Sequence, residues 1–274
     1  FGGDSTNTPV LDDITLNYTT TGTCSTPPVG GGNYTVSTNC AFAPASETSI
    51  VRDLGSTPGN GTITGTTVVP GKYGSARKFN GSSDFLSIPD STPLDITGDF
   101  TISAWVNRAG TGNNSIVSKV AGSPPSGGGY GLITGNAGEV YCRTSDGPGW
   151  TDSYTTTGLL TSSTGWTHLA VVRTGTSCKV WVNGVDRTTS AGTHTTLTAN
   201  NSNLTIGRRT DGSEYLNGQI DDVRIYNYAR SEQQIKDDMN EAPMTTNLPV
   251  GWWKMDDGYI SGVDNGNITV STGV

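Results

Sequence analysis

Residues 218–240 constrain the fold more than any other part of the chain, because they predict a closing β-strand followed by a short helix. Val223 and Ile225 alternate with polar neighbours, which is the side-chain period of a half-buried strand. The same count places Asp221 on the face of these two aliphatic side chains. An aspartate that faces a core needs a hydrogen-bonding partner, so the sequence predicts a strand that carries one buried carboxylate.

A short, capped helical turn is predicted directly after this strand. Ser231 and Gln234 have the spacing of a capping box, in which each side chain accepts a hydrogen bond from the other residue's backbone. Ile235 and Met239 give the turn one apolar stripe. We interpret the whole stretch as the end of a β-sandwich module.

The composition of the rest of the chain is typical of an all-β protein. Glycine accounts for 38 of the 274 residues, and short runs rich in Val, Ile, Thr, Tyr and Trp are broken by Gly, Asn and Pro. The net charge of −8 argues against nucleic acid as a partner, because phosphates require a basic surface, whereas a cation or a neutral polar partner fits. Apolar runs stay well short of the roughly 18 residues that a membrane span needs. The chain begins at Phe1 without an initiator Met or a signal-peptide pattern, so we expect a mature or excised segment.

The four cysteines allow three disulfide pairings, and none of them has the Cys-x-x-Cys spacing of zinc and redox sites. We predict the local pairing, Cys24 with Cys40 and Cys142 with Cys178, which indicates an oxidising compartment. The alternative is four buried free thiols in a cytosolic protein. The Thr-, Ser- and Gly-rich, charge-poor composition disfavours that alternative.

Three parts follow one another along the chain. Residues 1–48 are rich in Thr, Pro and Gly and predict an N-terminal β extension with a local disulfide. Residues 49–243 predict a sandwich, because strand candidates alternate with turn signals at the usual spacing. Within them, Asn183-Gly184 predicts a type I′ hairpin. In the clearest strand candidate, the side chains expected on one face are Phe100, Ile102, Ala104 and Val106. Residues 244–274 form a tail.

Five motifs occur in order in the middle part: the stretch 69–88, Asp99-Phe-Thr-Ile-Ser-Ala-Trp-Val, Gly165-Trp-Thr-His-Leu-Ala-Val-Val, Val180-Trp-Val-Asn-Gly and Gly218-Gln-Ile-Asp-Asp-Val-Arg-Ile-Tyr-Asn. In this order they resemble the laminin G-like branch of the concanavalin A-like lectin/glucanase superfamily. The resemblance implies an all-β jelly roll of two antiparallel sheets with a short C-terminal helical turn, and β extensions are expected at both ends. Side-chain alternation independently requires a sandwich.

The tail contains Val250-Gly-Trp-Trp-Lys-Met-Asp-Asp-Gly, which resembles the opening strand of a laminin G-like domain although it follows the closing helix. We interpret it as the start of a following module in a tandem array. Two alternatives remain: a strand donated to a neighbouring copy, which would build a head-to-tail fibre, and a strand that returns to its own sandwich. Trp252, Trp253 and Met255 are too apolar to lie in water and are the candidate assembly residues.

The search for catalytic residues finds no recognisable set. Laminarinase-like relatives of this superfold use Glu-x-Asp-x-x-Glu on one strand, a spacing that none of the five glutamates in this chain has. His168 and His194 are far apart, and the resemblance implies a structural role for His168. Neither histidine belongs to a motif with a serine or cysteine nucleophile. We therefore expect that the protein is not an enzyme.

Calcium is the one cofactor expected. Hard cations take several oxygen ligands, and the candidates are Asn80, Asp84, Asp221 and Asp222. The resemblance implies that Asp84 and Asp221 are the first to consider, because related jelly rolls carry calcium at sheet edges. The alternative is that Asp221 accepts backbone N–H bonds from a neighbouring turn, which satisfies a buried carboxylate equally well.

Two loops are candidates for ligand binding, because loops of a sandwich carry binding residues while the sheets hold them in place. One offers Asp146, Trp150, Asp152 and Tyr154, and the other offers Arg208 and Arg209 beside Asp211 and Tyr215. Aromatic rings beside polar groups suit a sugar ring. The alternative is that Trp150 packs beneath its own loop and the charges are solvated.

These observations predict a non-catalytic extracellular or cell-surface module that works in adhesion or binds a glycan or an extracellular protein. The alternatives are a structural subunit of a head-to-tail fibre, joined by strand exchange through the tail, and an accessory domain of a carbohydrate-active enzyme. The expected partners are accordingly a glycan, an extracellular protein or further copies of the chain.

Overall fold

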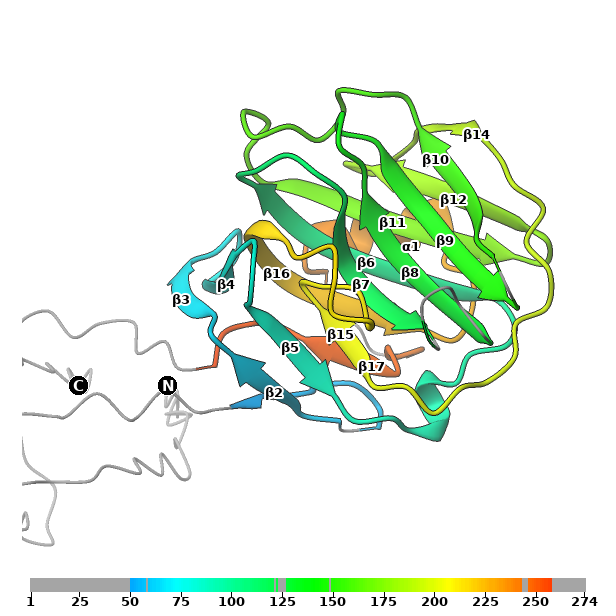
Figure 1. Ribbon diagram of the computed structural model, residues 1–274, viewed down its shortest axis with the longest axis horizontal. Helices are drawn as coiled ribbons and strands as arrows, with labels where there is room; N and C mark the ends of the chain where they lie inside the picture. The colour runs from blue at the N-terminus through cyan, green and yellow to red at the C-terminus, as the bar shows by residue number, and fades with distance from the viewer. Residues whose placement is uncertain are drawn as a thin grey trace, which may run out of the picture. The chain divides into compact units, whose positions relative to one another are not determined.

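The computed structural model of the chain describes residues 50–57, 59–120, 122, 127–147, 149–242 and 246–257. These residues form two antiparallel β-sheets packed face to face, with one α-helix (Figure 1). The predicted all-β sandwich is confirmed. The N-terminal extension, the pairing of Cys24 with Cys40 and the tail beyond Asp257 lie outside the described residues, so the expectations for them stay predictions.

One sheet has nine strands. Their order is β1 (Ile50–Val51), β2 (Gly61–Thr64), β5 (Phe85–Ile88), β15 (Leu204–Ile206), β7 (Asn114–Val120), β8 (Gly128–Thr134), β9 (Val140–Asp146), β10 (Thr151–Thr155) and β14 (Thr188–Ser190). A short 3-10 helix, η1, spans Thr92–Leu94.

The other sheet has eight strands. Seven follow the order β13 (Val185–Asp186), β12 (Ser177–Val182), β11 (Thr167–Thr174), β6 (Phe100–Arg108), β16 (Asn217–Tyr226), β4 (Ser75–Asn80) and β3 (Thr67–Pro70). The eighth strand, β17 (Gly251–Trp253), also pairs with β16. The predicted hairpin joins β12 to β13, with φ angles of 50° at Asn183 and 73° at Gly184.

The main core lies between the sheets and is built by alternating side chains. On β6 the four side chains predicted to share a face all lie in this core, namely Phe100, Ile102, Ala104 and Val106. Trp105 lies on the other face of the strand, outside that core. Full burial of one large aliphatic or aromatic side chain contributes about 1.5–3 kcal/mol, so each core-facing residue of this alternation stabilises the sandwich.

Strand β16 departs from simple alternation at a β-bulge. Its register against β6 shifts after Asp221, and the next residue, Asp222, has a φ of 49°. Val223 and Ile225 face the core, but Asp221 pairs with Trp105 on the outer face. The prediction that Asp221 shares a face with Val223 and Ile225 is wrong, because the extra residue of a bulge moves every earlier side chain to the opposite face.

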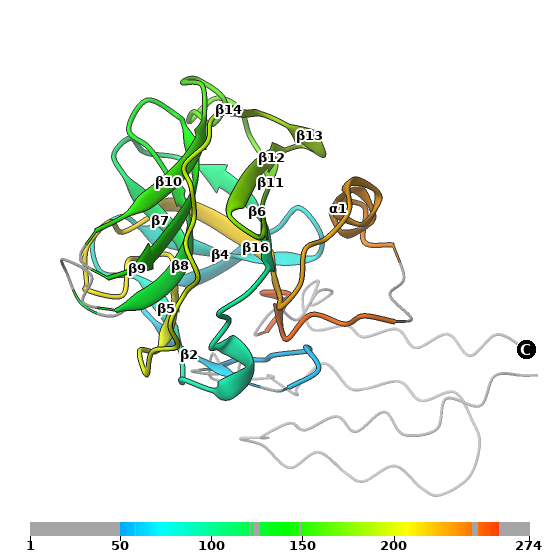
Figure 2. The same cartoon turned by 90° about the vertical axis from the view of Figure 1, so that its right-hand side faces the viewer.

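Helix α1 (Glu232–Met239) begins with the predicted capping box. The backbone N–H of Gln234 donates to Ser231, and the backbone N–H of Ser231 donates to the Gln234 side chain. Ile235 packs with Val172 and Trp181 of the eight-stranded sheet. Figure 2 shows α1 on the side of that sheet facing away from the nine-stranded sheet. Within the described part of the chain, no helix is long and apolar enough to cross a membrane.

Buried charges fasten α1 to β16. Asp238 forms ion pairs with Arg224, 3.0 Å away, and with Arg230, and it accepts a hydrogen bond of 2.9 Å from the Tyr226 hydroxyl. Asp238 and Arg224 are each only 1% exposed. Removal of one partner from a buried pair costs about 3–5 kcal/mol, because the other charge is left uncompensated.

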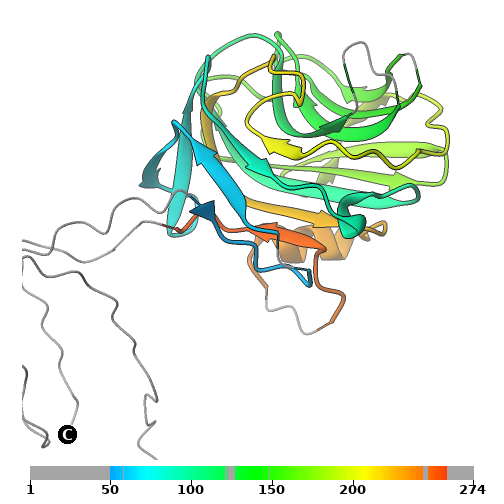
Figure 3. The ribbon, with the colours of Figure 1, turned by 60° about the horizontal axis from the view of Figure 1, so that its bottom comes forward.

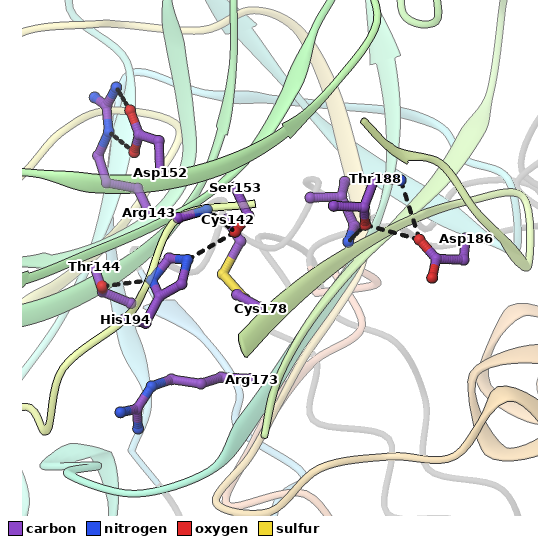
Figure 4. Close-up of a disulfide and its surroundings, with 12 residues drawn as sticks. Cys142, Arg143, Thr144, Asp152, Ser153, Arg173, Cys178, Asp186, Thr188 and His194 are labelled. Carbon is purple, nitrogen blue, oxygen red and sulfur yellow. Dashed lines mark hydrogen bonds and ion pairs between the residues drawn. A yellow bond between two sulfur atoms is a disulfide. The ribbon is translucent and has the colours of Figure 1, made fainter. Parts of the chain in front are cut away.

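A disulfide joins the two sheets. Cys142 on β9 is bonded to Cys178 on β12, with their Cα atoms 6.3 Å apart (Figure 4). This half of the predicted pairing is confirmed. The bond crosses the core, since β9 belongs to the nine-stranded sheet and β12 to the eight-stranded sheet.

The tail segment that contains the two adjacent tryptophans returns to the chain's own sandwich. Strand β17 lies along β16 (Figure 3). The side chain of Trp253 is fully buried in the main core. The backbone N–H of Trp252 donates to Asp53 at 2.7 Å, and Met255 is also fully buried. Residues 251–253 therefore adopt the self-closing alternative in this structure. The start of a following module in a tandem array and exchange of this strand with a neighbouring copy both stay predictions.

Candidate ligand-binding face

The outward side chains of β9 and β10 form rows across the nine-stranded sheet. Tyr141 on β9 pairs with Tyr154 on β10, and Arg143 pairs with Asp152. The intervening Cys142 is fully buried and bonded towards the core, as alternation requires. Figure 4 shows the Arg143–Asp152 pair apart from the disulfide, on the other side of these strands. Every second residue of the two strands is thus available for a surface function.

The two tyrosines of the first row form an aromatic pair. Their ring centroids are 5.1 Å apart with an interplanar angle of 33°. Tyr154 is 37% exposed and Tyr141 is half-buried. Burial, followed by the nearby charge of Glu139, raises the pKa of Tyr141, so its hydroxyl stays protonated at neutral pH.

The second row is an ion pair with two hydrogen bonds. Arg143 donates from Nε and Nη2 to the two carboxylate oxygens of Asp152, at 2.8 and 2.9 Å. Burial alone would lower the pKa of Arg143, but hydrogen bonding to Asp152 and the charges of Asp152 and Glu214 outweigh it and raise the pKa. The guanidinium therefore stays charged and is held in place by a bidentate partner.

The loop that follows β15 comes to the same place. Arg209 pairs with Glu214 at 2.8 Å and with Asp211 at 2.5 Å, and Glu214 also lies 3.7 Å from Arg143. The Trp150 ring centroid is 5.0 Å from the Arg143 guanidinium carbon and 5.7 Å from that of Arg209. The first of the two predicted loops is largely strand, since Asp152 and Tyr154 lie on β10, and the turn before β10 meets the second loop at Trp150.

We call this surface the aromatic face, and it consists of Tyr141, Arg143, Trp150, Asp152, Tyr154, Arg209, Asp211 and Glu214. It includes four of the six predicted ligand-binding residues, namely Trp150, Asp152, Tyr154 and Arg209. The alternative for Trp150 holds in part, because its ring is half-buried beside two guanidiniums.

The other two predicted residues lie elsewhere. Asp146, at the end of β9, accepts a hydrogen bond from the Thr195 hydroxyl. The Arg208 guanidinium stacks on Phe85, 3.5 Å from the ring centroid, and donates to the Tyr215 hydroxyl at 3.2 Å. Their side chains are thus used within the fold.

Sequence reasoning missed Tyr141, Arg143 and Glu214 as members of this face. Alternation around Cys142 could have identified Tyr141 and Arg143, since a cysteine that is bonded towards the core has outward neighbours. Glu214 depends on the path of a loop with a φ of 52° at that residue, for which alternation gives no signal.

The four predicted metal ligands lie in two separate pairs. Asn80 accepts hydrogen bonds from the backbone N–H groups of Ser82 and Ser83, and Asp84 accepts one from the backbone of Asn80. These contacts lock the turn between β4 and β5. Asn80 pairs with Asn217 at the start of β16. Asp221 lies four residues beyond Asn217, which places its backbone about 13 Å further along that strand.

The second pair is held by hydrogen bonds of its own. Asp221 accepts from the backbone N–H of Tyr73 at 2.9 Å, as the alternative reading for this residue expects. Asp222 pairs with Arg224 at 2.8 Å and accepts from the Trp252 indole at 2.6 Å. The four side chains do not fit a single coordination shell, and calcium stays a prediction for experiment.

Among the described residues, one cluster of metal-ligating side chains does come together: Cys142, Cys178 and His194. The two sulfurs are bonded to each other, and His194 is fully buried between the hydroxyls of Thr144 and Ser153, at 2.7 and 2.8 Å (Figure 4). Burial, followed by the charge of Arg173, lowers the pKa of His194. This cluster supports the core.

The remaining histidine, His168, is only 2% exposed and lies against Trp105, with ring centroids 5.3 Å apart. Burial, with a smaller effect of Arg224, lowers the pKa of His168 to about 3. The His168 imidazole is therefore buried and neutral at ordinary pH. This supports the structural role that the resemblance implies.

Solved structures share this fold. Domain 4 of AbnA, a GH43 extracellular arabinanase from Geobacillus stearothermophilus solved in complex with arabinotriose, is 24% identical, with a TM-score of 0.52 over 65% of this chain and 87% of that domain. The binding domain of Paraclostridial Mosquitocidal Protein 1 is 18% identical, with a TM-score of 0.53 over 71% of this chain and 52% of that one. No curated protein matches the sequence significantly.

The family assignment comes from the sequence itself. The family model for laminin G type 3 domains, described as concanavalin A-like lectin/glucanases superfamily, matches residues 80–236, which is more than half of the chain. The match covers β5 through β16 and reaches into α1. The chain therefore belongs to the laminin G-like family of the concanavalin A-like lectin/glucanase superfamily.

Proposed function

We propose that the chain is a non-catalytic, secreted glycan-binding module that uses the aromatic face. The observation that carries the proposal is the convergence of Tyr141, Tyr154 and Trp150 on one surface that also presents fixed guanidinium and carboxylate groups. Sugar rings stack their C–H faces on aromatic side chains, and their hydroxyls require donors and acceptors at fixed positions. The face offers both.

Two further observations support this proposal. The inter-sheet disulfide suits an oxidising, extracellular compartment. A domain with the same fold has been solved with arabinotriose bound, which shows that this kind of sandwich can hold an oligosaccharide. Such a module can be part of a surface protein or an accessory domain beside a catalytic domain, because in both settings it binds a glycan.

Hydrolysis is not part of the proposal. Retaining and inverting glycosidases need a carboxylic acid and a carboxylate placed across the scissile bond. The carboxylates of the aromatic face, Asp152, Asp211 and Glu214, are instead paired with guanidiniums. A glycosidase acid must instead be free to reach the glycosidic oxygen and donate a proton to it.

The test is binding to a panel of immobilised oligosaccharides, followed by titration of the best ligand. We expect Tyr154→Ala and Trp150→Ala each to weaken binding by about fivefold or more, because loss of an aromatic anchor costs more than about 1 kcal/mol. Val185→Ala, at an exposed apolar residue on the other sheet, is the control and is expected to bind like the wild type. A panel without a single ligand would overturn the proposal.

A further inference from the structure

We propose that the aromatic face selects neutral glycans and rejects anionic ones. This inference rests on the proposed function and adds the chemical class of the ligand. It comes from the charge balance of the face, in which each guanidinium already has carboxylate partners within the chain.

Arg143 illustrates the first half of this balance. Its Nε and Nη2 atoms donate to both oxygens of Asp152, and Glu214 lies 3.7 Å from Nη1. The Arg143 side chain is 15% exposed and Asp152 23%. A carboxylate or sulfate of a ligand could gain bidentate contact at the Nε–Nη2 edge only by displacing Asp152, which would then lose its partner. At the Nη1–Nη2 edge it would meet the carboxylate of Glu214.

Arg209 repeats the arrangement on the neighbouring loop. Two of its nitrogens donate to Asp211, at 2.9 and 2.5 Å, and Nη1 donates to Glu214 at 2.8 Å. The Arg209 side chain is 18% exposed, and Asp211 and Glu214 are each 14% exposed. Both guanidiniums are therefore already paired with carboxylates of the chain when a ligand arrives, and neither is a ready binding site for an anion.

The sum of these charges is negative. Two guanidiniums and three carboxylates leave the face with a net charge of −1, within a chain of net charge −8. An approaching anion meets repulsion at close range and over the whole molecule. A neutral sugar does not, and its hydroxyls can donate to carboxylate oxygens and accept from guanidinium N–H groups that ion pairing holds at fixed positions.

The experiment compares neutral polysaccharides (arabinan, xylan, laminarin and dextran) with anionic ones (polygalacturonate, alginate and heparin) by affinity electrophoresis and calorimetry. Measurements are made at about 20 mM and about 500 mM salt, because screening separates charge effects from stacking. We expect at least one neutral glycan to bind, with affinity that changes less than about twofold between the two salt concentrations. We expect the anionic glycans to bind at least about tenfold more weakly at low salt.

Two variants make the test specific. Asp152→Asn and Glu214→Gln each remove a carboxylate while preserving shape, and we expect each to gain salt-sensitive binding of the anionic glycans. Thermal unfolding checks that each variant is folded. If one variant does not fold, the other alone is enough for the test. Wild-type protein that prefers an anionic glycan would overturn this inference but leave glycan binding intact. Failure to bind any glycan, in contrast, would overturn the proposed function itself.

Discussion

The carboxylate of Asp221 accepts a hydrogen bond from the backbone N–H of Tyr73, 2.9 Å away, while only 1% of the Asp221 residue is exposed. Burial, together with the charges of Asp222 and Asp256, raises the pKa of Asp221 to about 7, although the hydrogen bonds from Tyr73 and Lys72 act in the opposite direction. The bulge of β16 thus places an ionisable group where its charge is poorly tolerated at neutral pH.

This residue predicts a fall in stability with rising pH. Between the unfolded pKa of about 3.9 and the folded pKa of about 7, the folded state binds more protons, so the free energy of unfolding decreases through that window. Asp221→Asn cannot ionise and should flatten the decrease, by up to about 1.4 kcal/mol for each unit of pKa shift. Urea unfolding at pH 4, 6 and 8 measures it, and Asp237→Asn on α1 is the control. Equal pH profiles for Asp221→Asn and wild type would contradict the assignment.

The inter-sheet disulfide is expected to contribute about 4 kcal/mol, because it closes a loop between residues 36 positions apart. The double variant Cys142→Ala/Cys178→Ala should lose this contribution in urea unfolding. Reductant should destabilise the wild type strongly and the double variant much less, which separates this bond from any effect of Cys24 and Cys40. A reductant effect of the same size in both proteins would show that the bond is unimportant for stability.

The fully buried side chain of Trp253 predicts a large loss of stability when it is shortened. Trp253→Ala should cost about 3–5 kcal/mol, since it opens a cavity and removes the 3.1 Å hydrogen bond from the indole to the Gly59 carbonyl. Trp252→Ala is the matched comparison, because Trp252 is half-buried and lies on the outer face beside Arg224. Equal losses for both variants would mean that β17 is not seated in its own sandwich.

The same segment tests strand exchange between copies. A self-closing β17 predicts monomers in analytical ultracentrifugation at all concentrations. Concentration-dependent assembly that disappears when residues 244–274 are deleted would instead support the fibre alternative. The two results exclude each other.

Calcium is tested by thermal unfolding with and without a chelator. If calcium binds as predicted, a chelator should lower the unfolding midpoint. Each of the four candidate ligands already has hydrogen-bonding partners within the chain, so an unchanged midpoint would mean that these contacts suffice without an ion. A calcium-dependent rise in the midpoint that Asp84→Asn abolishes would place the ion at the turn between β4 and β5.

Much of the fold could be predicted because it follows local rules. Alternation on β6, the Asn183-Gly184 hairpin and the capping box at Ser231 each depend on a few neighbouring residues, and the structure confirms all three. The position of Asp221 could not be predicted in this way, because a bulge is set by how two strands fit together rather than by either strand alone.

The site was predictable only in part for a similar reason. The composition of two loops indicated Trp150, Asp152, Tyr154 and Arg209, but the sequence does not say that these loops meet. Their meeting depends on the strand order, in which β7 and β8 separate β15 from β9. The loop after β15 reaches across these strands to Arg143 and Trp150. Arg208, next in sequence to Arg209, turns instead to Phe85.

The disulfide also has a consequence for recognition. Cys142 stands between Tyr141 and Arg143 on β9, so the covalent link to β12 anchors the very strand that displays both side chains. The surface should therefore be preorganised, so that little binding free energy is spent on ordering the protein when a ligand binds. Reduction of this bond should weaken recognition even in molecules that stay folded, by loosening the platform rather than by removing any contact.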